Sequence, residues 1–319
     1  VVWCFRPLWV TFPVSNEVAV PYRNLADCPE EEVMTAISQP ASPLPALSLP
    51  ALASLLLSLL LLTGPSSARA SDSLALKYSV FAYGLPAMNL DVAIDQNPSA
   101  YAMRVEAETK PVIGLIARWS LQAVTVGRVS DAASTAAVLW PEYQDMTSVW
   151  RREPRHQRMD FLEGGNVSVS FNPDRNIAPE ETVPADQLAG AVDPITAVLS
   201  LVRAVASGEG CRATGPIFDG RRLYAMDLTD LGERNMASVL DSSLSGVAVG
   251  CRMERRHLAG KSLNDDGKER AVDVWFMRPS ADLPVLPVYM ETGGAFGFQM
   301  HLRQAEAVSA PTVVTRLPE

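Results

Sequence analysis

The two residues whose type and spacing first suggest chemistry are Cys211 and Cys251, which lie forty residues apart. This spacing fits neither a zinc knuckle nor the C-x-x-C motif of a dithiol oxidoreductase. The other two cysteines, Cys4 and Cys28, lie in the first 70 residues, which are typical of a secretion signal as described below. The remaining even pair in an exported chain predicts a structural disulfide. In the chain-entropy model, a closed loop of about 40 residues stabilises the folded state by roughly 4 kcal/mol. Two free buried thiols and a redox-active pair are the competing interpretations.

The other residues that could carry catalysis are few and scattered. The three histidines, His156, His257 and His301, each stand alone in the sequence. There is no H-E-x-x-H metal motif, no G-x-S-x-G nucleophile elbow and no glycine-rich loop of a phosphate or dinucleotide site. We therefore expect a protein that is not an enzyme and that uses neither a metal nor a cofactor. A hydrolase whose catalytic residues meet only in the fold is the third-ranked alternative.

Arginines gather in two stretches, WRREPRHQR at 150–158 and CRMERRH at 251–257, and another pair lies between them. Because a guanidinium group matches the geometry of a phosphate, such residues could form a rim that binds anionic headgroups. The candidate rim residues are Arg151, Arg152, Arg155, Arg221, Arg222 and Tyr224. The plainer interpretation is solvated arginines paired with neighbouring acids such as Glu153, Asp160 and Glu254. The aromatic residues likewise have two interpretations: they pack in the core, or they line an apolar cavity.

The charge balance excludes one class of partner. The whole chain carries a formal net charge of −9. The first 70 residues hold three basic and five acidic residues, which leaves 24 basic and 31 acidic residues and a formal charge of −7. Nucleic-acid binding requires clustered Lys and Arg that neutralise phosphates. We therefore expect no nucleic-acid partner.

The first 70 residues differ from the rest and are typical of a secretion signal. Residues 51–62 (ALASLLLSLLLL) form an uncharged, mainly apolar run that is too short for a bilayer span of roughly 20 residues. The small residues Ala68 and Ala70 are typical of a signal-peptidase site. We therefore expect a signal peptide over 34–70, cleaved after Ala70, preceded by unfolded upstream translation over 1–33.

This assignment predicts a periplasmic protein with a single β-rich domain over residues 71–319. No cysteine follows closely after the apolar run, so a lipoprotein anchor lacks its acceptor. No Lys or Arg lies between Met34 and the apolar run, and an uncleaved membrane anchor is therefore the alternative.

Most of the chain after Ser71 alternates between apolar and polar residues, which is the period of half-buried strands. Strands are predicted at 74–83, 88–95, 101–109, 119–126, 135–140, 147–153, 156–163, 166–171 and 245–258. The proline-containing segment 172–192 interrupts this pattern. It is either a surface excursion or a lid over a cavity.

One helix is predicted after this segment, with Asp193 as N-cap, Pro194 as first residue and an end near Gly208. Its residues are apolar except for one narrow polar stripe, so the helix should be mostly buried. Asp219-Gly220 then predicts a β-hairpin. We expect an all-β, mainly antiparallel fold: a large curved sheet forming an open, half or spiral barrel around this helix.

Several of these features together resemble one family. They are the Asp193-Pro194 helix start, a cysteine followed by a PIFDGRRLY hairpin, the later Cys251, Arg278-Pro279 and an LPV run before a terminal hairpin. This combination resembles the exported Gram-negative bacterial proteins catalogued as domain of unknown function 3108. The resemblance implies a periplasmic all-β protein with an open or spiral barrel, akin to half-barrels that carry lipids and lipoproteins.

The leading functional hypothesis is a non-enzymatic periplasmic protein that binds a lipid or another amphipathic envelope component in a half-barrel cavity. The alternative is a structural or interaction factor of the cell envelope with a solid core. The cavity separates the two hypotheses, because only the first one requires it.

Overall fold

The computed structural model describes residues 72–130, 138–175, 177–178, 181–212, 215–237, 239–240, 244, 246–261, 271–293, 297–309 and 313. The expected upstream segment and signal peptide, 1–70, lie outside the described residues. In the part of the chain that is described, no helix combines the length and apolarity needed to cross a bilayer.

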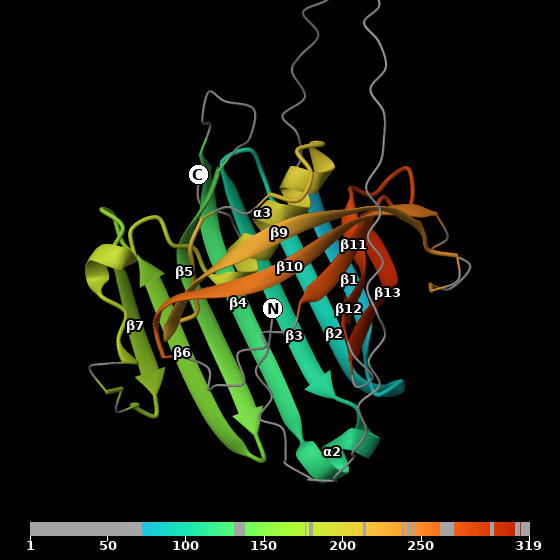
Figure 1. Cartoon of the computed structure of the whole chain (residues 1–319). Coiled ribbons are helices and arrows are strands. Elements are labelled where there is room, and N and C mark those ends of the chain that lie inside the picture. The colour runs from blue at the N-terminus through green and yellow to red at the C-terminus, as the bar shows by residue number, and fades with distance from the viewer. Residues whose placement is uncertain are drawn as a thin grey trace, which may run out of the picture. The chain divides into compact units, whose positions relative to one another are not determined.

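Thirteen strands form one antiparallel sheet with the order β7-β6-β5-β4-β3-β2-β1-β13-β12-β11-β10-β9-β8 (Figure 1). The first seven strands are β1 (Asp72–Ala82), β2 (Leu85–Gln96), β3 (Ala100–Thr109), β4 (Trp119–Ser130), β5 (Val138–Trp150), β6 (Glu153–Phe161) and β7 (Val167–Asn172). The remaining strands are β8 (Ile217–Phe218), β9 (Arg222–Asn235), β10 (Val247–Gly260), β11 (Val272–Met277), β12 (Leu286–Thr292) and β13 (Phe298–Val308). We call β1–β7 the N-terminal half and β8–β13 the C-terminal half.

Two meanders make up the sheet, because within each half every strand pairs with its neighbour in sequence. The halves join where β1 pairs with β13. The free edges are β7 and β8, which do not pair with each other, so the sheet is open and not a closed barrel. The predicted fold class, an open curved antiparallel sheet, is confirmed.

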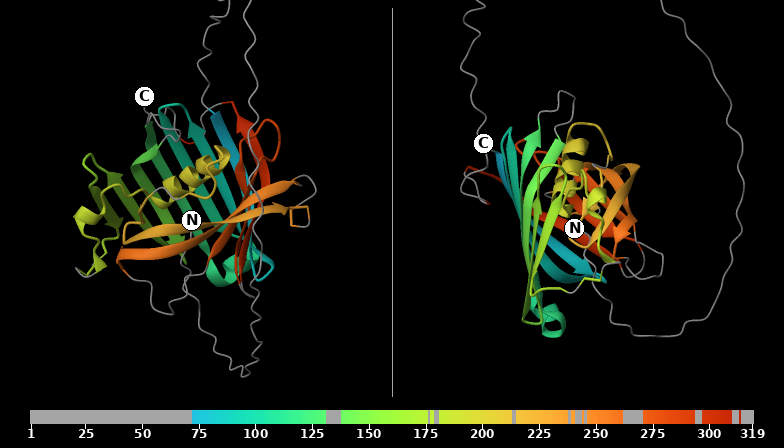
Figure 2. Two further views of the ribbon diagram at one scale, coloured as in Figure 1. Left: turned by 45° about the horizontal axis from the view of Figure 1, so that its top comes forward. Right: turned by 90° about the vertical axis from the view of Figure 1, so that its left-hand side faces the viewer.

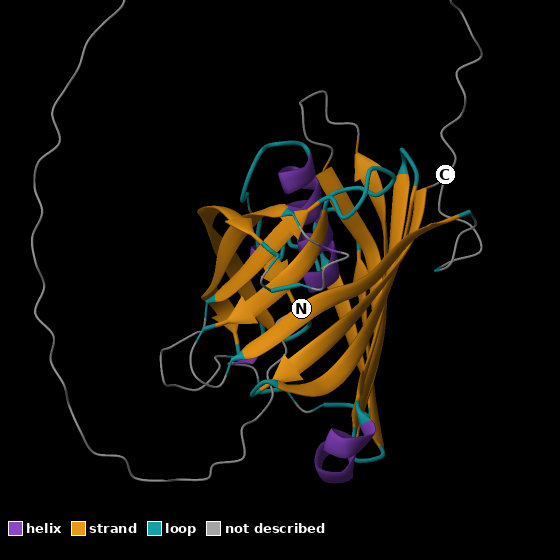
Figure 3. Ribbon diagram, turned by 90° about the vertical axis from the view of Figure 1, so that its right-hand side faces the viewer, coloured by secondary structure: helices purple, strands orange, loops and turns teal. Residues whose placement is uncertain are grey.

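Helix α3 (Pro194–Ala206) lies between the two halves, against the concave side of the sheet (Figures 2 and 3). Its buried residues are Ile195, Thr196, Leu199, Ser200 and Leu201. These residues fall on more than one side of the helix, which requires neighbours on both sides. The prediction of one mostly buried helix is confirmed.

Strand β5 corrects the prediction of two separate segments at 135–140 and 147–153. It runs without interruption from Val138 to Trp150, although Pro141 lies inside it. The pairing with β4 shifts its register at Gly127, opposite Pro141, and bulges are where a sheet tolerates proline. A Cβ atom at Gly127 would collide with the carbonyl oxygen of Trp140, so only glycine permits this close approach.

A second helix, α2 (Pro111–Ala117), was not predicted from the sequence. It connects β3 and β4 and leaves Val112 and Leu115 exposed. A helix of seven residues has too few turns to show an amphipathic period, so the sequence carried little signal for it.

The described part of the segment 172–192 packs into the core and includes the 3₁₀ turn Ala185–Gln187. It contributes Val183, Leu188 and Ala191 to an apolar cluster with Met159, Phe218 and Leu223. This cluster fills the space between β6–β7 and β8–β9, where the two sheet edges approach each other. Neither interpretation of this segment from the sequence, as a surface excursion or as a lid, predicted that it packs into the core.

Candidate functional site

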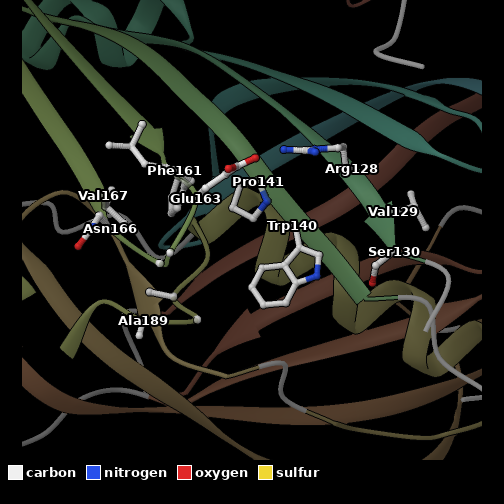
Figure 4. Close-up of a pocket in the computed structure, with 15 residues that line it drawn as sticks. Arg128, Val129, Ser130, Trp140, Pro141, Phe161, Glu163, Asn166, Val167 and Ala189 are labelled. Carbon is white, nitrogen blue, oxygen red and sulfur yellow. The ribbon is translucent and has the colours of Figure 1, made fainter. Parts of the chain in front are cut away.

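A cleft of about 660 Å³ lies beside the ends of β4 and β5, the β6–β7 turn and residues 189–191 (Figure 4). Its apolar lining includes Val129, Trp140, Phe161, Leu162 and Val167. Trp140 is 46% exposed and Leu162 is 53% exposed, so the cleft leaves large apolar side chains open to solvent. Pockets of roughly 300–1,000 Å³ with an apolar lining are typical sites for small ligands.

Local glycine geometry shapes one wall of this cleft. The β6–β7 turn closes with a hydrogen bond from the Leu162 amide to the Asn166 carbonyl. Gly164 and Gly165 both have φ of +84°, a backbone conformation that favours glycine. A Cβ atom at Gly165 would lie 3.0 Å from the Cα atom of Ala189, so glycine also lets the turn approach the segment 189–191.

The polar groups of the cleft are few. Arg128 and Glu163 lie on one side of the cleft, and the Trp140 ring lies on another (Figure 4). The Arg128 Nε atom donates to Glu142 at 2.8 Å. Among the described residues, Ser130 and Asn166 are the other polar lining residues, and no histidine, cysteine or lysine lines the cleft. This composition suits a ligand with a large apolar part and a small polar part.

A second polar feature, the buried network, joins α3 to the N-terminal half. Asp193 is the N-cap of α3 and accepts hydrogen bonds from the amides of Ile195 and Thr196 at 2.9 and 3.1 Å. It also accepts from the Thr125 hydroxyl on β4 at 3.0 Å and from Gln144 Nε2 on β5 at 2.8 Å. These contacts place the carboxylate of the helix cap inside the fold.

Tyr101 and Thr196 complete the buried network. The Thr196 hydroxyl donates to Asp193, and its oxygen lies 2.7 Å from the Tyr101 hydroxyl on β3. The side chains of Tyr101, Thr125, Asp193 and Thr196 are fully buried. Burial raises the pKa of Asp193, and the hydrogen bonds from Thr196 and Thr125 oppose that rise. Its side chains are buried and join the N-cap of α3 to β3, β4 and β5, so we assign the network to helix placement.

The cysteines form the predicted disulfide. Cys211 lies in the segment after α3, and Cys251 lies on β10, with their Cα atoms 5.6 Å apart. Cys251 is fully buried in an apolar cluster with Leu201 and Phe276. The bond therefore ties the C-terminal end of the helix segment to the C-terminal half of the sheet.

The first three candidate rim arginines lie at the β5–β6 turn. Arg151 and Arg152 are exposed in the turn itself, and the Arg151 guanidinium lies 5.6 Å from the Trp150 ring centroid. Arg155 lies near the start of β6, with Glu153 at 3.9 Å. The turn is at the opposite end of β6 from the cleft, so these residues do not line it.

The other three lie at the β8–β9 hairpin, which forms at the predicted position. Arg221 pairs with Glu181 at 3.0 Å, and Arg222 donates to Asp219 through Nε at 2.7 Å. Tyr224 is buried beside Val192 and Ile217, and burial raises its pKa.

No candidate rim residue is among the residues that line the cleft. The structure places the six residues at the β5–β6 turn and at the β8–β9 hairpin. Arg155 of the first group and Arg221 of the second each lie two residues from the contact that joins Gln157 to Asp219.

Several other arginines fit the plainer interpretation, in which solvated arginines pair with neighbouring acids. Arg252 pairs with Asp273 and Arg256 pairs with Asp227 across neighbouring strands. Arg158 pairs with Asp160 at 2.8 Å. These guanidinium groups are occupied by carboxylates on the sheet surface.

The sequence did not indicate Arg128 or Glu163 as cleft residues, and Trp140 was one of many aromatic residues with two interpretations, core packing or cavity lining. The available signal was the combination of Trp140-Pro141, which requires a bulge, with the Gly164-Gly165 pair, which requires a tight turn. Neither signal indicates that the two sites lie side by side.

Comparison with known proteins identifies the family. The family model described as "Protein of unknown function (DUF3108)" matches residues 77–303, which is most of the chain, and the chain belongs to this family. No curated protein matches the chain. One similar solved structure is described as a beta-barrel-like protein of domain of unknown function DUF1849 from Brucella abortus. It is 13% identical, with a TM-score of 0.41 over 76% of this chain and 100% of that chain.

Proposed function

We propose that this DUF3108 protein is a non-enzymatic binding protein of the bacterial cell envelope that holds a lipid or another amphipathic molecule in the cleft beside Trp140. The observation that carries the proposal is the cleft itself, with its volume of about 660 Å³ and its exposed apolar lining. Exposed apolar area costs free energy in water, and a bound apolar group removes that cost. The disulfide supports an oxidising compartment, as expected for a periplasmic protein.

The cleft differs in place from the half-barrel cavity expected from the sequence. Helix α3 occupies the concave side of the sheet, and the cleft lies at the ends of β4–β7. An acyl chain or an aromatic group would lie against Trp140, Phe161 and Leu162. Its polar end would then face Arg128, Glu163 or solvent.

The test is native mass spectrometry and lipid extraction of protein secreted to the periplasm and purified from it. We expect a bound amphiphile and, after its removal, rebinding of a fluorescent fatty acid. Trp140→Ala should weaken this rebinding by about tenfold or more, because it removes a large apolar contact surface.

Two exposed leucines give a matched pair of variants. Leu162→Ser changes the lining of the cleft, whereas Leu115→Ser changes an exposed position on α2. Only Leu162→Ser should lower the affinity for the fluorescent fatty acid. The proposal is wrong if the purified protein carries no amphiphile and binds none, or if both leucine variants bind equally well.

The alternative proposal is an envelope factor that acts through its surface. It is favoured by the filling of the concave side, where α3 buries Ile195, Leu199 and Leu201. Crosslinking in cells should then capture one specific protein, and Trp140→Ala should leave that crosslink unchanged.

A further inference from the structure

The two sheet edges meet along a seam that carries a group of basic residues. At this seam Gln157 Nε2 on β6 donates to the Asp219 carbonyl at 2.9 Å. A Cβ atom at Gly220 would collide with Gln157, so the β8–β9 turn presses directly on β6. The seam therefore brings together residues that are more than 60 positions apart in the sequence.

Four separate segments each supply one cation to this seam. Arg155 lies two residues before Gln157 on the same face of β6, and Arg221 lies in the β8–β9 turn. Lys261 follows β10, and its amide donates to the Arg221 carbonyl at 3.1 Å. Arg175 follows β7, and its guanidinium lies 5.1 Å from the centroid of the Phe171 ring, which pairs with Gln157 in register. We call Arg155, Arg175, Arg221 and Lys261 the basic cluster.

Carboxylates neutralise the basic cluster only in part. Glu181 is shared, because it accepts from Arg221 at 3.0 Å and from the Lys261 amine at 2.9 Å. Arg155 has Glu153 at 3.9 Å, near the limit of an ion pair. Arg175 has no carboxylate partner among the described residues. Among the described residues, these four cations therefore share two ion-paired acids, in a chain whose net charge is negative.

Two further observations indicate that the basic cluster lacks a hydrogen-bond acceptor and a negative charge. The Arg221 Nε atom is buried and has no hydrogen-bond partner in the described part of the chain, although a buried donor normally has one. Burial lowers the pKa of Arg175, and the positive charges of Arg221 and Arg155 lower it further. The positive charges of Arg221 and Arg155 therefore both act on the Arg175 guanidinium.

We propose that the basic cluster at the seam binds a phosphate-type anion, either a free phosphate group or the headgroup of a phospholipid. Guanidinium groups donate paired hydrogen bonds to phosphate oxygens, and a doubly charged anion offsets the repulsion among the cations. The side chains are reachable, since Arg155 is 52% exposed and Lys261 is 42% exposed.

This site is distinct from the cleft of the proposed function. Arg155 and the cleft residue Phe161 are six residues apart on β6, which corresponds to roughly 20 Å. Binding at the seam can therefore fail or succeed independently of binding at the cleft.

The first experiment uses inorganic phosphate as the probe. Phosphate should raise the melting temperature of the full disulfide-bonded protein more than sodium chloride does at equal ionic strength. Arg175→Gln should weaken the phosphate affinity by about tenfold, because it removes a charge-assisted hydrogen bond. Arg256→Gln is the matched control, since this exposed guanidinium pairs with Asp227 away from the seam. Equal shifts with both salts, or equal losses in both variants, would overturn the proposal.

Glu181→Gln gives an effect of opposite sign. This change frees Arg221 and Lys261 from their shared carboxylate and should tighten phosphate binding severalfold. A folded Glu181→Gln protein that binds phosphate more weakly than the natural protein would contradict the proposal.

Vesicles distinguish the two sources of the anion. Phosphatidylcholine vesicles with and without phosphatidylglycerol are sedimented with the protein. Recruitment that requires phosphatidylglycerol and is lost in Arg175→Gln assigns the site to a lipid headgroup. Phosphate binding without such recruitment assigns it to a free phosphate group. If the protein neither binds phosphate nor is recruited to the vesicles, the proposal is wrong.

Discussion

Helix α3 contacts the two halves of the sheet by different means. Towards the N-terminal half it uses hydrogen bonds, through the contacts of Asp193 and Thr196 with Tyr101, Thr125 and Gln144. Towards the C-terminal half it uses apolar packing, since Leu201 is buried in a cluster with residues of β10 and β11. The disulfide adds a covalent tie on this second side only.

The two kinds of contact have different effects on α3: one fixes its position, and the other stabilises it. Hydrogen bonds depend on direction, and a buried donor left without an acceptor is costly, so the buried network permits few positions of the helix. Apolar packing is non-directional and scales with buried area, so it can stabilise several helix positions almost equally. We infer that the hydrogen bonds to the N-terminal half place α3 and that the apolar packing of Leu201 against the C-terminal half stabilises it.

The largest expected effect comes from removing the centre of the buried network. Asp193→Ala deletes the helix cap and leaves the Thr125, Thr196 and Gln144 donors without their shared acceptor. Each unsatisfied buried group costs about 1–3 kcal/mol, so we expect a loss of about 4–5 kcal/mol in urea unfolding. A loss below about 1 kcal/mol would show that the network does not place the helix.

The second largest effect tests the covalent tie. Replacing both Cys211 and Cys251 by Ala opens a loop of 40 residues, and the free energy of unfolding should fall by about 4 kcal/mol. Urea unfolding of the double variant beside the oxidised protein measures this loss. Thiol titration of the secreted protein should find no reactive group at these positions, and two reactive groups would contradict the disulfide.

The third effect tests the apolar side. Leu201→Ala should lower the free energy of unfolding by about 3 kcal/mol, because it leaves a cavity in a buried cluster. Leu258→Ala is the matched control, since Leu258 is 42% exposed, and it should change stability by less than about 0.5 kcal/mol. Equal losses in both variants would mean that burial on the C-terminal side does not stabilise the fold.

Features that depend on neighbouring residues were predictable from the sequence. The helix start at Asp193-Pro194 and the turn at Asp219-Gly220 follow from local backbone chemistry. The period of two indicated an antiparallel sheet, and the cysteine pair indicated the disulfide. The error at Pro141 arose because a proline usually ends a strand, and the glycine that permits the bulge lies on the neighbouring strand.

Features that depend on distant pairings were not predictable in the same way. The partners of Asp193 lie on β4 and β5, 68 and 49 residues away. One signal existed, because Thr125 is polar on the inner face of β4 that also carries Leu121 and Ala123. The cleft was even less predictable from the sequence, because it forms only where the β6–β7 turn meets residues 189–191. The candidate rim arginines come from two regions of the chain, and the sequence alone did not indicate that Arg155 and Arg221 would lie beside one contact, between Gln157 and Asp219.

The smallest expected effect comes from removing a single side-chain hydroxyl from the buried network. Thr125→Val keeps the shape of the side chain and removes one hydroxyl, which donates to Asp193 at 3.0 Å. Gln144 Nε2 still donates to Asp193 at 2.8 Å, so the carboxylate keeps its hydrogen bond to β5. The Thr125 hydroxyl also accepts from Gln144 Nε2 at 3.3 Å, so two hydrogen bonds are lost, and we expect a loss of about 1–2 kcal/mol in urea unfolding. Thr229→Val, at an exposed position on β9, should have almost no effect and serves as the control. If Thr125→Val costs as much as Asp193→Ala, the network acts as one indivisible unit, and placement of the helix cannot be assigned to Asp193 alone.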